Sequence, residues 1–159
     1  MPDLLTKVRT EELRVFLSYA AGEETEAQAA LDALAALPKT RVFTVQDMKL
    51  SEKWRETIQQ ELQSCDLFLL LLTDHAAERN WTLQELGAAM GLRKPIILVI
   101  AQSEALKTFP YNLNSFPSVN LQDFTNPSHL RELLLPHRAA PLRAVAENGT
   151  QYEAAQQNL

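Results

Sequence analysis

Hydrophobic residues along the chain follow two alternating patterns. Short apolar runs predict β-strands, and between them lie stretches in which apolar residues recur every three or four positions, which predicts helices. The predicted strands are residues 14–19, 41–45, 66–73, 95–101 and 118–121. The chain therefore repeats a unit of one strand followed by one helix.

The first two helical segments follow the first two strands. Apolar residues recur at helical spacing over 27–37. In the next segment Trp54, Ile58 and Leu62 lie four residues apart, so they share one helical face that we expect to pack in the core. Ser51 is the expected N-cap of this helix, because a serine oxygen accepts a hydrogen bond from the unpaired N–H groups of a first turn.

Two further helices complete the pattern. One is expected over 81–92, after the third strand. The other should begin with Asn126 and Pro127, a good N-cap and first-turn pair, and should end at Pro136. Residues 102–117 show little periodicity, so we expect a loop that holds at most a short helix.

The type of hydrophobic run predicts the fold. The runs within 66–73 and 95–101 are continuously apolar instead of alternating, which is typical of strands covered on both faces in a parallel sheet. The weaker run at 118–121 suits a sheet edge. We therefore predict an α/β fold: a five-stranded parallel sheet of strand order 2-1-3-4-5 with helices on both faces.

Length and composition indicate one domain. The chain has 159 residues, of which 46% are hydrophobic, and this is enough to bury a core. We expect the domain to span residues 14–138, after an N-terminal extension over 1–13. Residues 139–159 are rich in Ala, Gln, Asn and Glu, with too little apolar surface to offset the entropy of ordering, so we expect a flexible tail or linker.

Charge, hydrophobic run length and cysteine content indicate which partners and which cellular compartment to expect. The net charge of −5 argues against a nucleic-acid partner, because such surfaces concentrate Lys and Arg. The longest apolar runs are far shorter than the roughly 20 residues that span a bilayer, so no membrane segment is expected, and no export signal is visible. The single cysteine, Cys65, is expected to be a buried, inert thiol. We therefore expect a cytoplasmic protein.

The predicted topology locates a ligand site. In open α/β sheets ligands bind beyond the carboxyl ends of the strands where the strand order reverses, here between the first and third strands. The first strand ends at Ser18 and Tyr19, and the third at Thr73 and Asp74. The next helix brings Glu85, a carboxylate among small and apolar side chains, beside the same crevice. These residues are the candidate substrate-binding and catalytic groups.

Several other kinds of site do not match the sequence. The glycines form neither a dinucleotide fingerprint nor a P-loop. A receiver domain would need an acidic cluster after the first strand and a lysine ending the fifth, and neither is present. His75, His129 and His137 show no metal-ligand spacing with one another or with Cys65, so no metal is expected. Ser18 lacks a nucleophile elbow, so we interpret it as a hydrogen-bonding residue.

Three stretches together resemble a TIR (Toll/interleukin receptor) domain of the bacterial type. They are RVFLSYA from residue 14, KWRETIQQELQSCDLFLLLLTD from residue 53, and NWTLQELGAAMGLRKPIILVI from residue 80. The resemblance covers 14–135, and its most specific element is the Trp-x-x-x-Glu pattern from Trp81 to Glu85. It implies a flavodoxin-like fold, self-association with other TIR domains, and a separate or fused sensor or effector domain as a further partner.

The resemblance also implies roles for individual residues. Glu85 matches the catalytic glutamate of family members that cleave NAD+ at the nicotinamide–ribose bond, so NAD+ is expected as the substrate and no cofactor is expected. Trp81 would form a wall of the pocket. Tyr19 and Ala20 would flank the adenine or ribose, and Asp47 belongs to the second loop of the family.

The function that we expect first is an NAD+ glycohydrolase or cyclase. It would release nicotinamide and either ADP-ribose or a cyclic isomer, in immune signalling, bacterial defence or NAD+ depletion. One fixed carboxylate suits this reaction, because nicotinamide leaves as a neutral base and the oxocarbenium-like ribose needs a nearby negative charge.

Two alternatives stay open. One is a non-catalytic module that binds only other TIR domains. The other is an enzyme like the nucleoside deoxyribosyltransferases, which would use Glu85 as a nucleophile. The helix dipole alone also favours a carboxylate in an early helical turn, so Glu85 has a purely structural interpretation as well.

Overall fold

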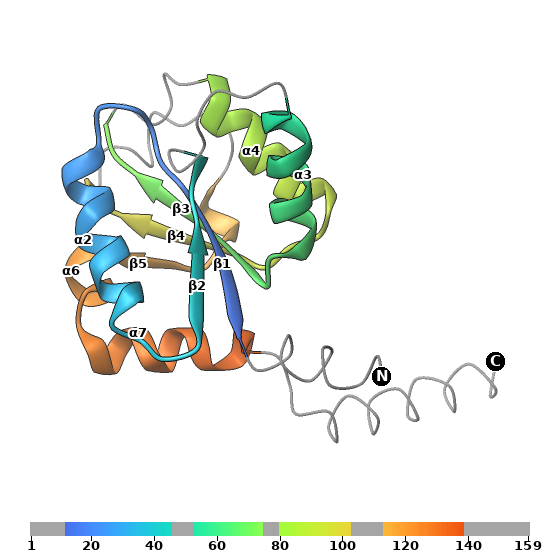
Figure 1. Ribbon diagram of the computed structural model, residues 1–159. Helices are drawn as coiled ribbons and strands as arrows, with labels where there is room; N and C mark the ends of the chain where they lie inside the picture. The colour runs from blue at the N-terminus through green and yellow to red at the C-terminus, as the bar shows by residue number, and fades with distance from the viewer. Residues whose placement is uncertain (1–11, 46–52, 75–79, 103–112, 139–159) are drawn as a thin grey trace, which may run out of the picture.

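The chain folds around one parallel β-sheet. The computed structural model describes residues 12–45, 53–74, 80–102 and 113–138, apart from the side chains of Asn80 and Trp81. The sheet has five strands in the order β2-β1-β3-β4-β5 (Figure 1). The strands are β1 (Leu13–Ser18), β2 (Thr40–Phe43), β3 (Leu67–Leu72), β4 (Ile96–Ile100) and β5 (Ser118–Asn120). The predicted order is confirmed, and β5 lies at the expected edge.

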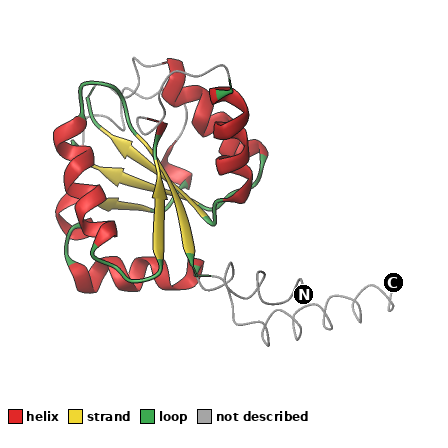
Figure 2. Ribbon diagram, in the orientation of Figure 1, coloured by secondary structure: helices red, strands yellow, loops and turns green. Residues whose placement is uncertain are grey.

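Helices cover both faces of the sheet, as predicted (Figure 2). One face carries α2 (Glu24–Ala35), α6 (Leu121–Phe124) and α7 (Pro127–Leu134), and the other carries α3 (Trp54–Ser64) and α4 (Asn80–Gly91). The short 3-10 helices η3 (Leu113–Ser115) and η4 (Leu135–His137) complete the described elements. Within the described ranges no helix has the length and apolar character needed to cross a membrane.

The central strand β3 shows why the sheet has two apolar layers. All of its residues are buried, and successive side chains of a strand point to opposite faces. Leu69 packs in the cluster beneath α2, α6 and α7, whereas Leu70 packs in the cluster beneath α3 and α4. A strand with two covered faces needs apolar residues at every position, which explains the continuous run in the sequence.

Backbone and side-chain hydrogen bonds fix β1 against β3. The backbone N–H of Arg14 donates to Oδ2 of Asp66 at 2.9 Å, and the backbone N–H of Asp66 donates to the carbonyl oxygen of Arg14 at 2.8 Å. The parallel register then places Ser18 beside Leu70. The carboxyl ends of the two strands therefore emerge at defined relative heights.

The segment directly after β5 contains the helix α6, which the sequence pattern does not predict. The predicted strand at 118–121 ends at Asn120, whose side-chain oxygen accepts a hydrogen bond from the backbone N–H of Asp123 at 2.7 Å and so caps α6. Asn126 caps α7 as predicted, because its side-chain oxygen accepts from two backbone N–H groups of the first turn at 3.1 and 3.3 Å. Two asparagine caps thus start two successive helices.

The helix α7 ends at Leu134, with Leu135 as its C-cap, so the expected stop at Pro136 is confirmed. A separate 3-10 turn, η4, follows, and Pro136 takes an early position in it. Proline is tolerated there, since its missing N–H would have no helical partner in a first turn. The expected N-cap at Ser51 is wrong, because α3 begins at Trp54 with Lys53 as its N-cap and without a side-chain capping bond. The tail at 139–159 and most of the 102–117 segment lie outside the described residues.

Arg138 links the end of the described chain to the turn before β2. Its guanidinium donates hydrogen bonds to the carbonyl oxygens of Lys39 at 3.1 Å and Pro38 at 3.2 Å, and to Oγ1 of Thr40 at 3.1 Å. The backbone N–H of Leu13 donates to the same Lys39 carbonyl at 2.8 Å. The first strand and the last described residue therefore meet at one turn.

Cys65 is buried at the C-terminal end of α3, as predicted. Its Sγ donates to the carbonyl oxygen of Leu62 at 3.2 Å. Burial raises the pKa of this thiol from 9.0 to about 11, against a smaller lowering by the nearby Lys94 ammonium. The reactive thiolate is therefore scarce at neutral pH, which fits the expected inert thiol.

We predict that Arg138→Ala lowers the melting temperature of the full chain by roughly 2–6 °C. The change removes all three guanidinium hydrogen bonds, and partly exposed bonds of this kind together contribute about 1–2 kcal/mol. Thermal unfolding followed by circular dichroism provides the measurement. Arg131→Ala, at an exposed position on α7, is the control and should melt within about 1 °C of wild type. Equal melting of the two variants would contradict a stabilising role.

The raised pKa of Cys65 predicts that its contribution to stability declines in alkaline solution. The folded protein keeps the thiol proton up to about pH 11, whereas the unfolded chain releases it near 9.0. Unfolding is therefore favoured more as the pH rises through this window. Urea titrations of wild type and Cys65→Ala should show a difference in free energy of unfolding that shrinks between these pH values. A difference that stays constant would show that the thiol keeps its ordinary pKa.

Candidate active site at the topological switch point

The connections that leave β1 and β3 diverge at the middle of the sheet. The chain after β1 enters α2 on one face, and the helix that follows β3 is α4 on the other face. A crevice therefore opens at the carboxyl ends of these two neighbouring strands, as the topology predicts. In the described structure it is a narrow hollow, lined by Leu17 and Ser18 of β1, by Tyr19 and Val45, and by Glu85 of α4.

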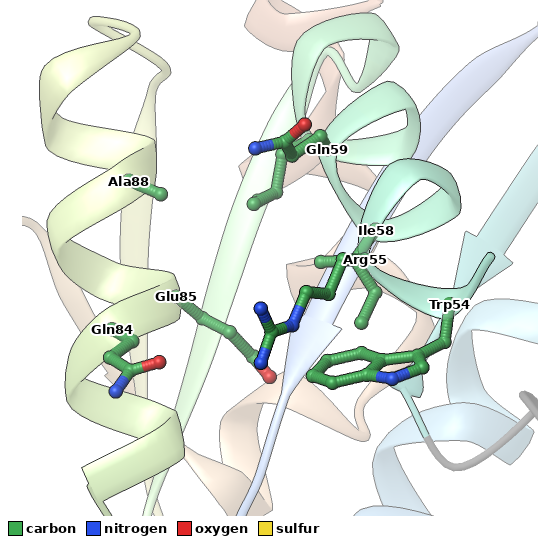
Figure 3. A pocket seen from close by; sticks show the side chains of 8 residues that line it. Trp54, Arg55, Ile58, Gln59, Gln84, Glu85 and Ala88 are labelled. Atoms are coloured by element: carbon green, nitrogen blue, oxygen red, sulfur yellow. The ribbon is translucent and has the colours of Figure 1, made fainter. Parts of the chain in front are cut away.

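The orientation of α4 on the sheet places Glu85 beside the crevice. Thr82, Leu86 and Ala89 are buried and form that face. Glu85 lies at its edge, about 100° around the helix from Leu86, so its side chain is directed toward α3 (Figure 3). Only 4% of Glu85 is exposed, which is an unusual environment for a carboxylate.

A wide cavity borders Glu85 on the side of α3. Its volume is about 400 Å³, within the range of about 300–1,000 Å³ that is usual for small-molecule sites. Side chains from α3 and α4 face each other across it (Figure 3). The lining residues are Trp54, Arg55, Ile58, Gln59, Leu62, Gln84, Glu85 and Ala88. Glu85 is common to this cavity and to the narrow crevice at the strand ends.

Two buried hydroxyl groups lie at the carboxyl ends of β1 and β3. Ser18 is 2% exposed and Thr73 is 1% exposed, and neither Oγ of Ser18 nor Oγ1 of Thr73 has a hydrogen-bond partner in the described part of the chain. A buried polar group without a partner costs about 1–3 kcal/mol. Within the described ranges, these hydroxyls are therefore unpaired polar groups buried at the strand ends.

Other predicted site residues have different positions. Ala20 is buried, and its carbonyl oxygen accepts from the backbone N–H of Glu23 at 3.2 Å, so it belongs to a turn. The backbone N–H of Asp74 donates to Oε1 of Gln102 at 2.6 Å and links the ends of β3 and β4. Ala20, Thr73 and Asp74 do not line either of the two hollows that Glu85 borders.

The remaining predicted positions fall partly or wholly outside the described residues. Asp47 and His75 lie outside them, as does the side chain of Trp81, whose backbone belongs to the first turn of α4. Among the described residues, no group of three His, Cys, Asp or Glu side chains gathers where a metal ion could be held.

Sequence reasoning missed the contribution of α3 to the cavity. The helical spacing of Trp54 predicts a core position, and the residue does pack against the buried cluster around Ile58, but it is only half-buried and also lines the cavity. Arg55 lines the same cavity. Its guanidinium carbon lies 5.2 Å from the centroid of the Trp54 ring. The available signal was the pair of polar residues Arg55 and Gln59, one turn apart and beside the apolar face.

Comparisons with known proteins support this architecture. No curated protein sequence matches the chain significantly. The structure of the Clostridium botulinum CMP N-glycosidase BcmB is similar, with 20% sequence identity, a TM-score of 0.50, and coverage of 74% of this chain and 98% of that one. At this identity the likeness concerns the fold. The family model of the TIR domain matches residues 15–134, and the chain therefore belongs to the TIR domain family.

Proposed function

We propose that this TIR domain is an NAD+ glycohydrolase that cleaves the bond between nicotinamide and ribose. The observation that carries the proposal is the buried carboxylate of Glu85, which borders both the crevice at the switch point and a cavity of about 400 Å³. NAD+ is the substrate, and the products are nicotinamide and ADP-ribose or a cyclic isomer.

Cleavage of the nicotinamide–ribose bond mainly requires one negative charge held close to the ribose. Nicotinamide departs from a cationic pyridinium as a neutral base, so no general acid is needed. The ribose left behind carries positive charge, and a carboxylate shielded from water stabilises it more strongly than one in solvent. At 4% exposure, Glu85 is shielded in this way. Water or a group of the substrate itself then attacks the ribose, which gives the open or the cyclic product.

The buried hydroxyl of Ser18 supports a ribose-binding role for the end of β1. A ribose presents hydroxyl groups that both donate and accept, and Ser18 lines the crevice with Glu85. Its hydroxyl, which lacks a partner in the described part of the chain, would gain one on substrate binding. The cost of leaving the Ser18 hydroxyl unpaired is thus recovered in the complex. The hydroxyl of Thr73 at the end of β3 also lacks a described partner, but it lines neither hollow beside Glu85.

A nucleotide N-glycosidase is the second candidate. The structurally similar BcmB is a CMP N-glycosidase, and breaking the bond between a base and ribose in CMP requires the same stabilised ribose cation. A nucleoside deoxyribosyltransferase-like reaction, with Glu85 as nucleophile, is a related alternative. The non-enzymatic alternative is a TIR module that acts only by binding other TIR domains. Incubation with NAD+, CMP and deoxynucleosides in parallel, followed by chromatography, distinguishes all four.

The proposed function includes self-association of the domain. TIR domains commonly self-associate, and a neighbouring copy would add walls to a shallow crevice. We place the reaction in the cytoplasm, in immune signalling, bacterial defence or NAD+ depletion. Activity assays should therefore cover a range of protein concentrations that includes the self-associated state.

We predict that Glu85→Gln lowers nicotinamide release from NAD+ by at least about a hundredfold, the scale of losing one electrostatic contact in a transition state. The amide keeps the shape of the side chain, so the melting temperature should change little. Glu132→Gln makes the same chemical change at an exposed position on α7 and should leave both values unchanged. Full turnover by Glu85→Gln would remove the catalytic assignment, and an assembled wild type that leaves NAD+ intact would remove the proposed substrate.

We predict that Ser18→Ala separates stability from activity. Removing a buried hydroxyl without a partner should leave the free energy of unfolding unchanged or raise it by about 1 kcal/mol, while NAD+ turnover falls about tenfold because one ribose hydrogen bond is lost. Urea titration and NAD+ consumption are the two measurements. Ser128→Ala, on the exposed side of α7, should alter neither. A Ser18→Ala variant that is clearly less stable would show that the hydroxyl is structural.

A further inference from the structure

We propose that Arg55 binds a phosphate group of the substrate, so that the site selects nucleotides over nucleosides. The proposal rests on the function proposed above, because it concerns the cavity that Glu85 borders. Arg55 and Glu85 line this cavity from two different helices, α3 and α4, and both side chains point into it (Figure 3). The cavity thus contains both a cation and a carboxylate.

Trp54 holds the guanidinium of Arg55 by a cation–π contact. The guanidinium carbon lies 5.2 Å from the centroid of the indole, within the range of such an interaction. A guanidinium carries five N–H donors in one plane, and a cation–π contact does not require them as hydrogen-bond donors. Two of them can therefore donate parallel hydrogen bonds to a phosphate, the geometry that arginine favours for this group.

The charges around the cavity favour an anion at Arg55. Among the described lining residues Arg55 is the only cation and Glu85 the only anion, and the other polar groups are the amides of Gln59 and Gln84. Arg55 lies in the first turn of α3, between the exposed Lys53 at the N-cap and the exposed Glu56. The two cations outnumber this one carboxylate, and the positive end of the helix dipole adds to them. In a chain with a net charge of −5, this local positive potential is what an anionic substrate needs.

A phosphate site at this place would position the bond to be cleaved. In NAD+ and in CMP alike, a phosphate is esterified to the 5′ oxygen of the ribose whose base is removed. A phosphate held by Arg55 would anchor that end of the ribose in the cavity and leave the carbon that bears the base toward Glu85. Arg55 therefore acts as a positioning and specificity residue, while Glu85 acts on the reacting atoms.

The test compares ligands with and without a phosphate. Binding of ADP-ribose and of nicotinamide riboside is measured by calorimetry on the full chain, for wild type and for Arg55→Met, Arg55→Lys and the control Arg131→Met. Arg55→Met keeps the apolar stem and loses the charge. We expect it to weaken ADP-ribose binding about 10- to 100-fold, the scale of charge-assisted hydrogen bonds, and to change nicotinamide riboside binding less than about twofold. Arg55→Lys should recover part of the loss, because the charge returns without the planar fork.

Turnover provides the second measurement. Arg55→Met should raise the KM for NAD+ and leave kcat within about threefold, because the phosphate contact is the same in the ground and transition states. Equal weakening of both ligands, unchanged binding of ADP-ribose, or no binding of ADP-ribose by wild type would each overturn the phosphate site.

The phosphate site and the proposed function can fail separately. A wild type that binds ADP-ribose through Arg55 but leaves NAD+ and CMP intact would overturn the proposed function and keep the phosphate site. A wild type that cleaves NAD+ with a KM unchanged by Arg55→Met would keep the function and overturn the phosphate site.

Discussion

The pairing of β1 with β3 is the contact on which the candidate site depends. These strands are neighbours in space but not in sequence, because β2 pairs on the far side of β1. The reciprocal hydrogen bonds between Arg14 and Asp66 fix their starts, and the register carries this alignment to Ser18 and Leu70. Because the chain leaves the two strands toward opposite faces, the crevice exists only while this pairing holds.

The site combines groups that a purely structural core would avoid. A carboxylate with 4% exposure and two hydroxyls without described partners all lie at or beside one crevice. The apolar layers beneath and above β3 supply the stability against which these groups are tolerated. Local sacrifices of stability are common where a site is organised in advance for a ligand. The candidate site therefore lies where polar groups interrupt the apolar layers.

The sequence was sufficient for the sheet and for the position of Glu85. Continuous apolar runs identified the strands covered on both faces, and the order of strands and helices then located the crevice. It was not sufficient for α6, because a four-residue helix has no measurable period and depends on the cap at Asn120. Periodicity also identifies the apolar face of a helix but not the helix that lies opposite, so the spacing of Arg55 and Gln59 marks a polar edge of α3 without showing that Glu85 lies across from it.

The residues at the strand ends also show what the sequence pattern cannot predict. Proximity to the crevice follows from the topology, whereas the direction of each group depends on local hydrogen bonds. Ala20 and Asp74 both lie within two residues of a strand end, yet the backbone of Ala20 closes a turn and that of Asp74 is bonded to Gln102. The topology therefore predicts which residues lie near the crevice. Hydrogen bonds of the backbone and side chains decide which of these residues line it.

The meeting of Leu13 and Arg138 at Lys39 has a mechanical consequence. Both contacts lie at the N-terminal end of β2, which in a parallel sheet is the pole opposite the carboxyl ends and Glu85. A force applied through the flanking chain would first load this small group of hydrogen bonds. The domain can thus be tethered at both of these positions with its crevice pointing away from the point of attachment.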